Sequence, residues 1–245
     1  MSHPIHILWC HPRSMSTAVE RVMRERGDLT ILHEPLINHY YIRRGTRTFP
    51  NFEPDPEQPQ DYWSVRETMI ELARRGPVFA KDQTYYALDE LLEDEEFLRR
   101  VRHAFLVRDP RAAVLSYYRK DPDLLDEEVG LVSQLRLHDR LRELGIASVI
   151  LRSEIIQTAA EAELGRWWAH SGLSSAPHAF RWSRGAVEDW NFVSDWHDKV
   201  QKSTGFEVRP FDPDAFRDMI SEAPHLAEYL AEHEPAYRAL LERAQ

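Results

Sequence analysis

The chain has 245 residues, 42% of them hydrophobic, and a net charge of −10 with its histidines neutral. This length and apolar content suit one α/β domain with a buried core, so we expect a single domain over residues 1–245. The acidic charge disfavours DNA, RNA and heparin-like polyanions as partners. No apolar stretch is long enough to span a membrane, and we expect neither a signal peptide nor a membrane partner. Because Cys10 is the only cysteine, no internal disulfide can form, which favours a cytoplasmic location.

Short apolar runs alternate with helical stretches along the chain. The predicted strands are residues 5–9, 30–33, 78–81, 104–107 and 147–151. This alternation predicts an α/β fold with three layers, in which helices cover both faces of a parallel sheet. Ligands of such sheets bind beyond the carboxyl ends of the strands. Four charged residues fall there: Arg13, Glu34, Lys81 and Arg108.

The first predicted strand ends in the segment CHPRSMST (residues 10–17), and an amphipathic helix follows. Unpaired backbone N–H groups and the positive end of the helix dipole favour an anion at this junction. We therefore predict a phosphate site formed by Pro12, Arg13, Ser14, Met15, Ser16 and Thr17. The alternative is that Ser16 or Thr17 only caps a structural helix. The segment lacks the glycines and the lysine of a nucleotide-triphosphate loop, which disfavours an ATP or GTP kinase.

The second predicted strand ends in LHEPL, where Pro35 prevents the strand from continuing and exposes Glu34 at the sheet edge. We predict that Glu34 is a general base. His33 is the rival base, because its ordinary pKa suits proton transfer, although strand alternation points it away from the side of Glu34. The remaining alternative is that Glu34 is a surface carboxylate.

Residues 43–62 are rich in proline, glycine and charge, and we expect a long surface loop that could act as a lid. Ser64 and Glu67 predict a capping box at the start of a helix over residues 65–75. Glu154, which follows the fifth predicted strand, is expected to be structural and to accept backbone or arginine hydrogen bonds.

The fourth predicted strand runs into RDPRAAVLS (residues 108–116), where an arginine beside a proline again opens a helix. A guanidinium at a helix start is suited to a phosphate. Two anion sites on one sheet suggest a ligand that is phosphorylated at both ends.

Three segments resemble motifs of one family. HPRSMSTA resembles the 5′-phosphosulfate loop of sulfotransferases, and RDPRAAVLS resembles their 3′-phosphate motif, with Arg108 eight positions before Ser116. SRGAVEDW (residues 183–190) resembles the family's R-K-G-x-x-G-D-W loop. Met15 stands where the family loop usually has glycine, and Ser183 and Glu188 also depart from the pattern. The resemblance spans most of the chain in the family's order, and it implies the P-loop-like sulfotransferase fold.

The resemblance implies transfer of a sulfuryl group from 3′-phosphoadenosine 5′-phosphosulfate (PAPS) to a hydroxyl or amine, with release of adenosine 3′,5′-bisphosphate (PAP) and no metal. Glu34 would take the acceptor proton. Lys81 would hold the sulfonate or the acceptor, unless it only forms a surface ion pair with Asp82. The implied binding residues are Arg13, Ser14, Ser16 and Thr17 at the 5′ end and Arg108, Ser116, Arg184 and Gly185 at the 3′ end.

Aromatic residues near the sheet edge favour a small, partly apolar acceptor over a polysaccharide; they are His39, Tyr40, Tyr41, Tyr85 and Tyr86. The sequence is also compatible with a homodimer. Two other classes also stay open at this point. A divergent P-loop kinase would use Asp109 as a magnesium ligand, and a noncatalytic nucleotide-binding module would keep the two arginines without needing Glu34.

Overall fold

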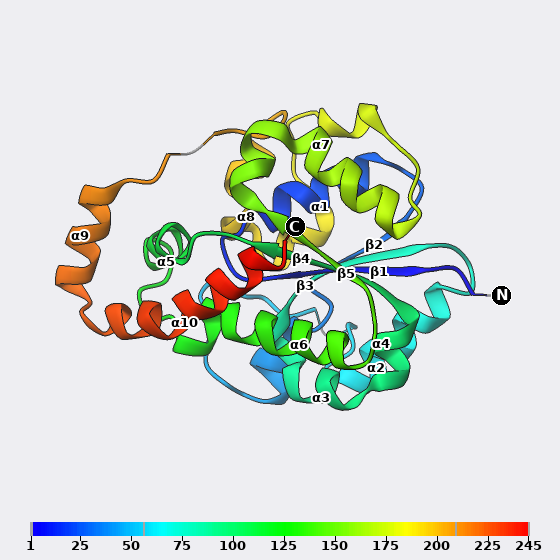
Figure 1. The fold of residues 1–245 in the computed structure, drawn as a ribbon, viewed down its shortest axis with the longest axis horizontal. Helices are drawn as coiled ribbons and strands as arrows, with labels where there is room; N and C mark the ends of the chain where they lie inside the picture. Colours follow the sequence, from blue (N-terminus) through cyan, green and yellow to red (C-terminus); the bar gives the residue numbers. More distant parts are fainter. Residues whose placement is uncertain (1, 56, 209, 245) are drawn as a thin grey trace.

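The computed structural model describes residues 2–55, 57–208 and 210–244. At its centre is a parallel sheet of five strands in the order β2-β3-β1-β4-β5 (Figure 1). The strands are β1 (Ile5–Cys10), β2 (Thr30–His33), β3 (Val78–Gln83), β4 (Val101–Val107) and β5 (Ser148–Arg152). Every predicted strand is present, and the expected three-layer α/β fold is confirmed.

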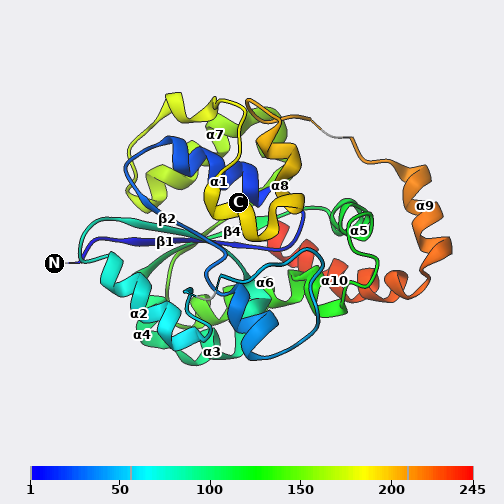
Figure 2. The same ribbon diagram turned by 180° about the vertical axis from the view of Figure 1, so that it is seen from behind.

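Helices cover both faces of the sheet. One face carries α1 (Ser16–Glu25), α7 (Ser153–Ser171) and α8 (Ser194–Gln201) (Figure 2). The other face carries α2 (Tyr62–Leu72), α3 (Leu88–Glu93), α4 (Glu95–Arg100), α6 (Leu131–Glu143) and α10 (His225–Glu242). Beyond the carboxyl ends of the strands lie α5 (Pro110–Tyr118) and α9 (Pro213–Glu222), so these two helices stand where ligands of such sheets bind.

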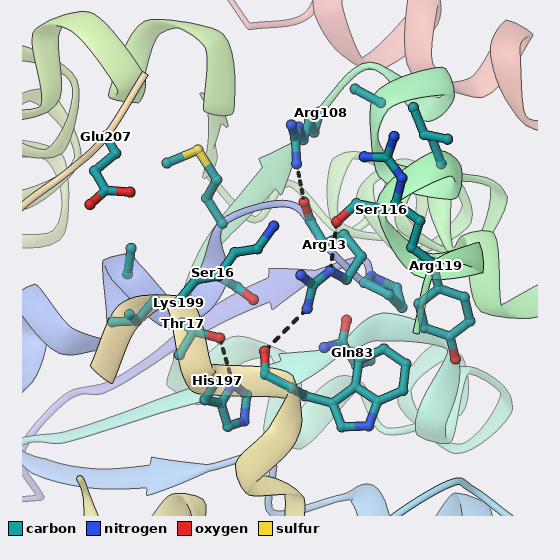
Figure 3. Close-up of a pocket in the computed structure, with 18 of the residues that line it drawn as sticks. Arg13, Ser16, Thr17, Gln83, Arg108, Ser116, Arg119, His197, Lys199 and Glu207 are labelled. Atoms are coloured by element: carbon teal, nitrogen blue, oxygen red, sulfur yellow. Dashed lines mark hydrogen bonds between the residues drawn. The ribbon is translucent and has the colours of Figure 1, made fainter. Parts of the chain in front are cut away.

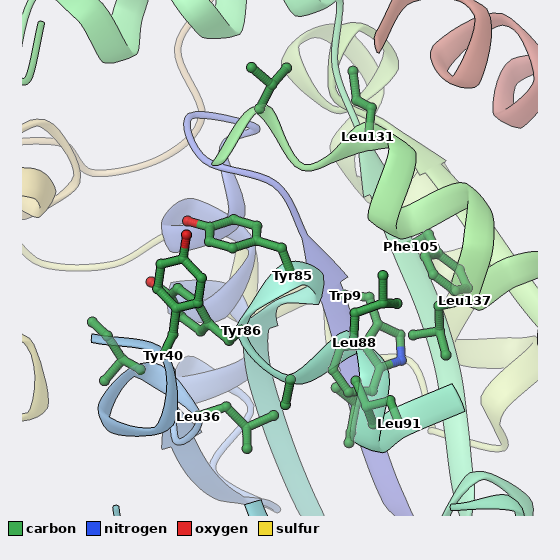
Figure 4. Packing of buried hydrophobic residues seen from close by; sticks show 14 of the residues in the cluster. Trp9, Leu36, Tyr40, Tyr85, Tyr86, Leu88, Leu91, Phe105, Leu131 and Leu137 are labelled. Carbon is green, nitrogen blue, oxygen red and sulfur yellow. The ribbon is translucent and has the colours of Figure 1, made fainter. Parts of the chain in front are cut away.

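The side chains of β1 alternate between two apolar cores, one on each face of the sheet. Leu8 packs in the core beneath α1 with Val19 and Val22, whereas Trp9 packs in the opposite core. Figure 4 shows Trp9 among side chains of α3, β4 and α6. The indole N–H of Trp9 donates to His103 Nδ1 at 2.9 Å, so this buried polar group is satisfied.

The predicted capping box is wrong. Helix α2 begins at Tyr62, and its N-cap is Asp61, whose carboxylate accepts from the Ser64 backbone N–H at 3.0 Å. Glu67 forms an ion pair with Arg66 instead of closing a box. The Ser64 hydroxyl itself donates to Asp61 Oδ2 at 2.7 Å, so the aspartate caps the helix, which starts three residues earlier than predicted. The long loop is present, and residues 44–55 and 57–61 carry no helix or strand.

The prediction for Glu154 is confirmed. Glu154 accepts a hydrogen bond from the Asp109 backbone N–H at 2.9 Å and thus supports the start of α5. Cys10 is buried, and burial raises the pKa of its thiol, so this cysteine is a packed residue. Among the described helices, none has the length and apolar character that crossing a membrane requires.

Candidate active site

A cavity opens beyond the carboxyl ends of β1, β3 and β4 (Figure 3). Its walls come from the loop between β1 and α1, from α5 and α8, and from Ser203 and residues 205–207 and 210–212. Eight residues predicted for the site line it: Pro12, Arg13, Met15, Ser16, Thr17, Glu34, Arg108 and Ser116. The sheet topology therefore gathers segments that are far apart in the sequence.

The loop between β1 and α1 has an unusual backbone. Arg13 and Met15 have φ angles of 62° and 73°, in the left-handed region that favours glycine. Met15 is the N-cap of α1, so the first turn of the helix, with Ser16 and Thr17, faces the cavity. Ser14 lies behind this wall, and its buried hydroxyl has no hydrogen-bond partner among the described residues. The start of α1 is thus suited to an anion, as predicted.

The two predicted phosphate-binding arginines meet in the cavity. Arg13 donates from Nε to Ser116 Oγ at 3.0 Å and from Nη1 to the Trp196 carbonyl at 3.1 Å. Arg108 donates from Nη1 to the Arg13 carbonyl at 2.7 Å. Figure 3 shows both guanidinium groups in one cavity, with Ser116 between α5 and the β1–α1 loop. A ligand with two anionic ends could contact both arginines at once.

Glu34 lies on the cavity wall but is only 7% exposed. Its carboxylate accepts from Lys81 Nζ at 2.5 Å, from Gln83 Nε2 at 3.1 Å and from the Tyr86 hydroxyl at 3.0 Å. Burial disfavours the charged form, but the positive charge of Lys81 and the hydrogen bonds from Lys81 and Gln83 outweigh it and lower the pKa of Glu34. The carboxylate is therefore ionised and able to accept a proton.

Lys81 does not line the cavity. Its ammonium is fully buried behind Glu34 and lies 3.8 Å from Glu20 Oε2. The alternative of a surface ion pair with Asp82 is wrong, because both groups are buried and Asp82 accepts from the backbone N–H groups of Leu36 and Gln83. Lys81 can act on a ligand only through the carboxylate that it holds.

His33 lies behind the cavity wall as well. Its Nδ1 lies 2.5 Å from Glu20 Oε2 and its Nε2 lies 3.0 Å from His197 Nε2. Both ring nitrogens are thus engaged, and neither meets the cavity directly. Glu34 is the one of the two candidate bases that a substrate could touch.

The cavity residues that were not singled out from the sequence include Phe49, Tyr117, Arg119, Trp196, His197 and Lys199. Phe49 belongs to the predicted lid and stacks on Trp196 with ring centroids 4.8 Å apart, so this loop does form a cavity wall. Trp196, His197 and Val200 have the i, i+1, i+4 spacing of one helix face. This spacing could have indicated one face of a helix, but it does not indicate that the face lines a cavity.

Of the other predicted residues, some line the cavity and some lie outside it. Arg184 is exposed, and the Gly185 N–H donates to the Gln201 carbonyl at 3.0 Å. Tyr85 and Tyr86 line the cavity, whereas the side chains of His39, Tyr40 and Tyr41 pair with Glu90, Glu127 and Glu128.

The kinase alternative has little support from the surroundings of Asp109. This carboxylate caps α5 through the Arg111 N–H at 2.9 Å and forms an ion pair with the Arg111 side chain. In the described parts of the chain, no group of three or more His, Cys, Asp or Glu residues could hold a metal ion.

The sequence matches the sulfotransferase domain family over residues 5–236. The chain therefore belongs to this family, whose chemistry is sulfuryl transfer. The sulfotransferase domain of the Synechococcus PCC 7002 olefin synthase has a similar fold, with 16% identity, a TM-score of 0.53, and coverage of 91% of this chain and 96% of that one. The sulfotransferase domain of the curacin biosynthetic pathway is also similar, with 14% identity, a TM-score of 0.51, and coverage of 91% and 97%. No curated protein sequence matches the chain.

Proposed function

We propose that the chain transfers a sulfuryl group from PAPS to a hydroxyl or amine of a small, partly apolar acceptor. The observation that carries this proposal is the meeting of Arg13 and Arg108 in one cavity, with the Arg108 guanidinium 2.7 Å from the Arg13 carbonyl. Arg13 also reaches Ser116 at 3.0 Å. Arg13, predicted for the 5′ end of the donor, and Arg108 and Ser116, predicted for its 3′ end, line the same cavity, which supports the proposal.

The 5′ end would lie at the start of α1. Arg13, the hydroxyls of Ser16 and Thr17, and the unpaired N–H groups of the helix start neutralise the negative charge that develops on the leaving phosphate oxygen. The acceptor oxygen or nitrogen forms a bond to sulfur as the bond from sulfur to the phosphate oxygen breaks. Arginines and the helix dipole supply the positive charge for this step.

The 3′-phosphate would lie against Arg108 and Ser116. Arg119 and Lys199 also line the cavity, so several cations offset the charge of the nucleotide. Arg184 lies outside this cavity, and its role at the 3′ end stays a prediction.

The acceptor would lie beside Glu34, against the rings of Phe49, Tyr85 and Tyr86. Glu34 receives the proton that leaves the acceptor as the new bond to sulfur forms. Lys81 holds the carboxylate ionised and in place. The aromatic wall favours an acceptor with an apolar part.

Thermal unfolding with nucleotides tests the donor. A ligand at about 100 times its Kd stabilises the native state by about 2.7 kcal/mol. For a chain of this length the midpoint should rise by roughly 5 to 10 °C. PAP should give this shift in EDTA, and ATP should give less with or without magnesium, because it leaves Arg108 and Ser116 without a 3′-phosphate. A shift with magnesium-ATP and none with PAP would overturn the proposal in favour of a kinase.

A further inference from the structure

A row of four hydrogen-bonded side chains connects the buried interior to the cavity wall. Glu20 Oε2 lies 2.5 Å from His33 Nδ1, and His33 Nε2 lies 3.0 Å from His197 Nε2. His197 Nδ1 in turn lies 3.0 Å from Thr17 Oγ1 (Figure 3). Thr17 lies in the first turn of α1, which is assigned to the 5′ end of the donor. The row therefore ends at the oxygen of a ligand-facing hydroxyl.

The two imidazoles are shielded from solvent. His33 and His197 are each 5% exposed, and Glu20 is fully buried. The ring centroid of Phe192 lies 5.4 Å from that of His33, and the Trp190 centroid lies 5.2 Å from that of His197. Thr17 is the least buried member of the row, and it lines the cavity together with the edge of His197.

Charged groups surround the row on several sides: Lys81 and Glu34 from the adjacent strand ends, Arg24 with Asp189 beside Glu20, and Arg13 on the cavity side. Burial disfavours the charge of Glu20, but His33, Lys81 and Arg24 outweigh it and lower the pKa of Glu20 to about 2. Burial lowers the pKa of His197 well below its ordinary value. Of the two imidazoles, only His33 contacts the Glu20 carboxylate, so a positive charge on the pair would lie beside a negative one there.

The distances allow two arrangements of protons. The ionised Glu20 accepts from His33 Nδ1 in both of them. With no additional proton, His33 Nε2 accepts from His197 Nε2, and His197 Nδ1 must accept from the Thr17 hydroxyl. With one additional proton, His33 Nε2 donates, the His197 proton moves to Nδ1, and that nitrogen donates to Thr17 Oγ1. Only in the second arrangement can the Thr17 hydroxyl donate its own proton to an anion in the cavity.

We propose that Glu20, His33 and His197 are positioning residues that set the direction of the Thr17 hydroxyl, and that an anion bound at Thr17 draws one proton onto the His33–His197 pair. The proton comes from solvent on binding and returns to it on release. This inference rests on the proposed donor site and extends it, because donor binding becomes linked to protonation. The hydrogen bond that a phosphate oxygen gains from Thr17 is charge-assisted.

Calorimetry of PAP binding in buffers of different ionisation enthalpy measures the protons taken up. The phosphate groups of PAP have a second pKa of about 6 and have already lost this proton at about pH 7.5. The ligand itself therefore contributes little to the number of protons taken up. We expect the wild-type chain to take up at least about half a proton more than the Thr17→Val variant, which lacks the hydroxyl. Thr17→Ser keeps the hydroxyl and should keep the uptake.

His197→Asn gives a second readout. The asparagine amide occupies the place of Nδ1 and can donate to Thr17 at every pH, so PAP affinity should stay within about threefold of wild type while the proton uptake disappears. Thr17→Val should lose about 10- to 100-fold in affinity, the range of one hydrogen bond to a charged group.

The outcomes separate the two proposals. If PAP binds and its uptake of protons is equal in wild type, Thr17→Val and Thr17→Ser, the row is only structural and this inference fails. If PAP does not bind the wild-type chain at all, the proposed donor fails instead. If His197→Asn does not fold, the pair of Thr17 variants still decides, because both leave the buried imidazoles in place.

Discussion

The Glu34 carboxylate lies 2.5 Å from the Lys81 ammonium, at the carboxyl ends of two adjacent strands. The backbone supports this pair, because the Glu34 N–H also donates to the Lys81 carbonyl at 2.8 Å. Glu34 has a φ angle of 42°, so the chain turns sharply as it leaves β2 and brings the carboxylate to the cavity. Lys81 lowers the pKa of Glu34, which keeps the carboxylate ionised.

Glu34→Gln should abolish most of the turnover. The amide keeps the shape of the side chain but cannot take the acceptor proton, and loss of a general base typically costs about 100- to 10,000-fold. PAP affinity should change by less than about threefold, because Glu34 lies on the acceptor side. Glu67→Gln, at a side chain that is 66% exposed, is the matched control. Turnover of Glu34→Gln close to that of the control would remove Glu34 from the mechanism.

Arg108→Ala should weaken PAP binding selectively. Loss of one hydrogen bond to a charged group costs about 1.5 to 3 kcal/mol, and adenosine 5′-phosphate should lose far less because it has no 3′-phosphate. Arg102→Ala removes the same charge from the exposed opposite end of β4 and should leave both affinities unchanged. Titration calorimetry with the two nucleotides gives the comparison. Equal losses of affinity for both nucleotides would mean that Arg108 supports the loop through the Arg13 carbonyl and does not bind the 3′-phosphate.

Met15→Gly should be more stable than Met15→Ala. Both changes remove the same long side chain, but Met15 has a φ angle of 73°, where a Cβ is strained and glycine is not. Alanine in such a conformation should cost about 1 kcal/mol relative to glycine, the reverse of the usual preference in a helix. Chemical denaturation of the two variants measures the difference. A more stable alanine variant would show that the loop relaxes out of the left-handed region.

The strands could be predicted closely from the sequence. A strand buried on both faces is a nearly continuous apolar run, as in Ile5–Cys10, and turn or helix signals follow each run. The residues at the strand ends could then be assigned to one edge without knowing any contact. This is why Arg13, Glu34 and Arg108 were predictable as members of one site.

Contacts between distant segments could not be predicted in the same way. Arg13 and Ser116 are 103 positions apart, and Thr17 and His197 are 180 apart. Local sequence patterns therefore cannot indicate that either pair is in contact. The side-chain burial of Lys81 was missed for a similar reason, since its partners are Glu34, just after β2, and Glu20 in α1. The start of α2 was missed because two capping residues, Asp61 and Ser64, compete within one turn.

Arg47→Met should destabilise the fold more than is expected for a residue of a predicted surface loop. Arg47 ties the long loop to the domain, with Nη2 at 2.6 Å from Asp121 Oδ2 and at 2.7 Å from Glu128 Oε2. Both carboxylates are buried, and removal of one partner from a buried ion pair costs about 3 to 5 kcal/mol. Arg74→Met breaks an exposed ion pair with Glu71 and should cost less than about 1 kcal/mol. Denaturant unfolding of both variants measures these costs, and equal values would mean that water reaches the two carboxylates once Arg47 is removed.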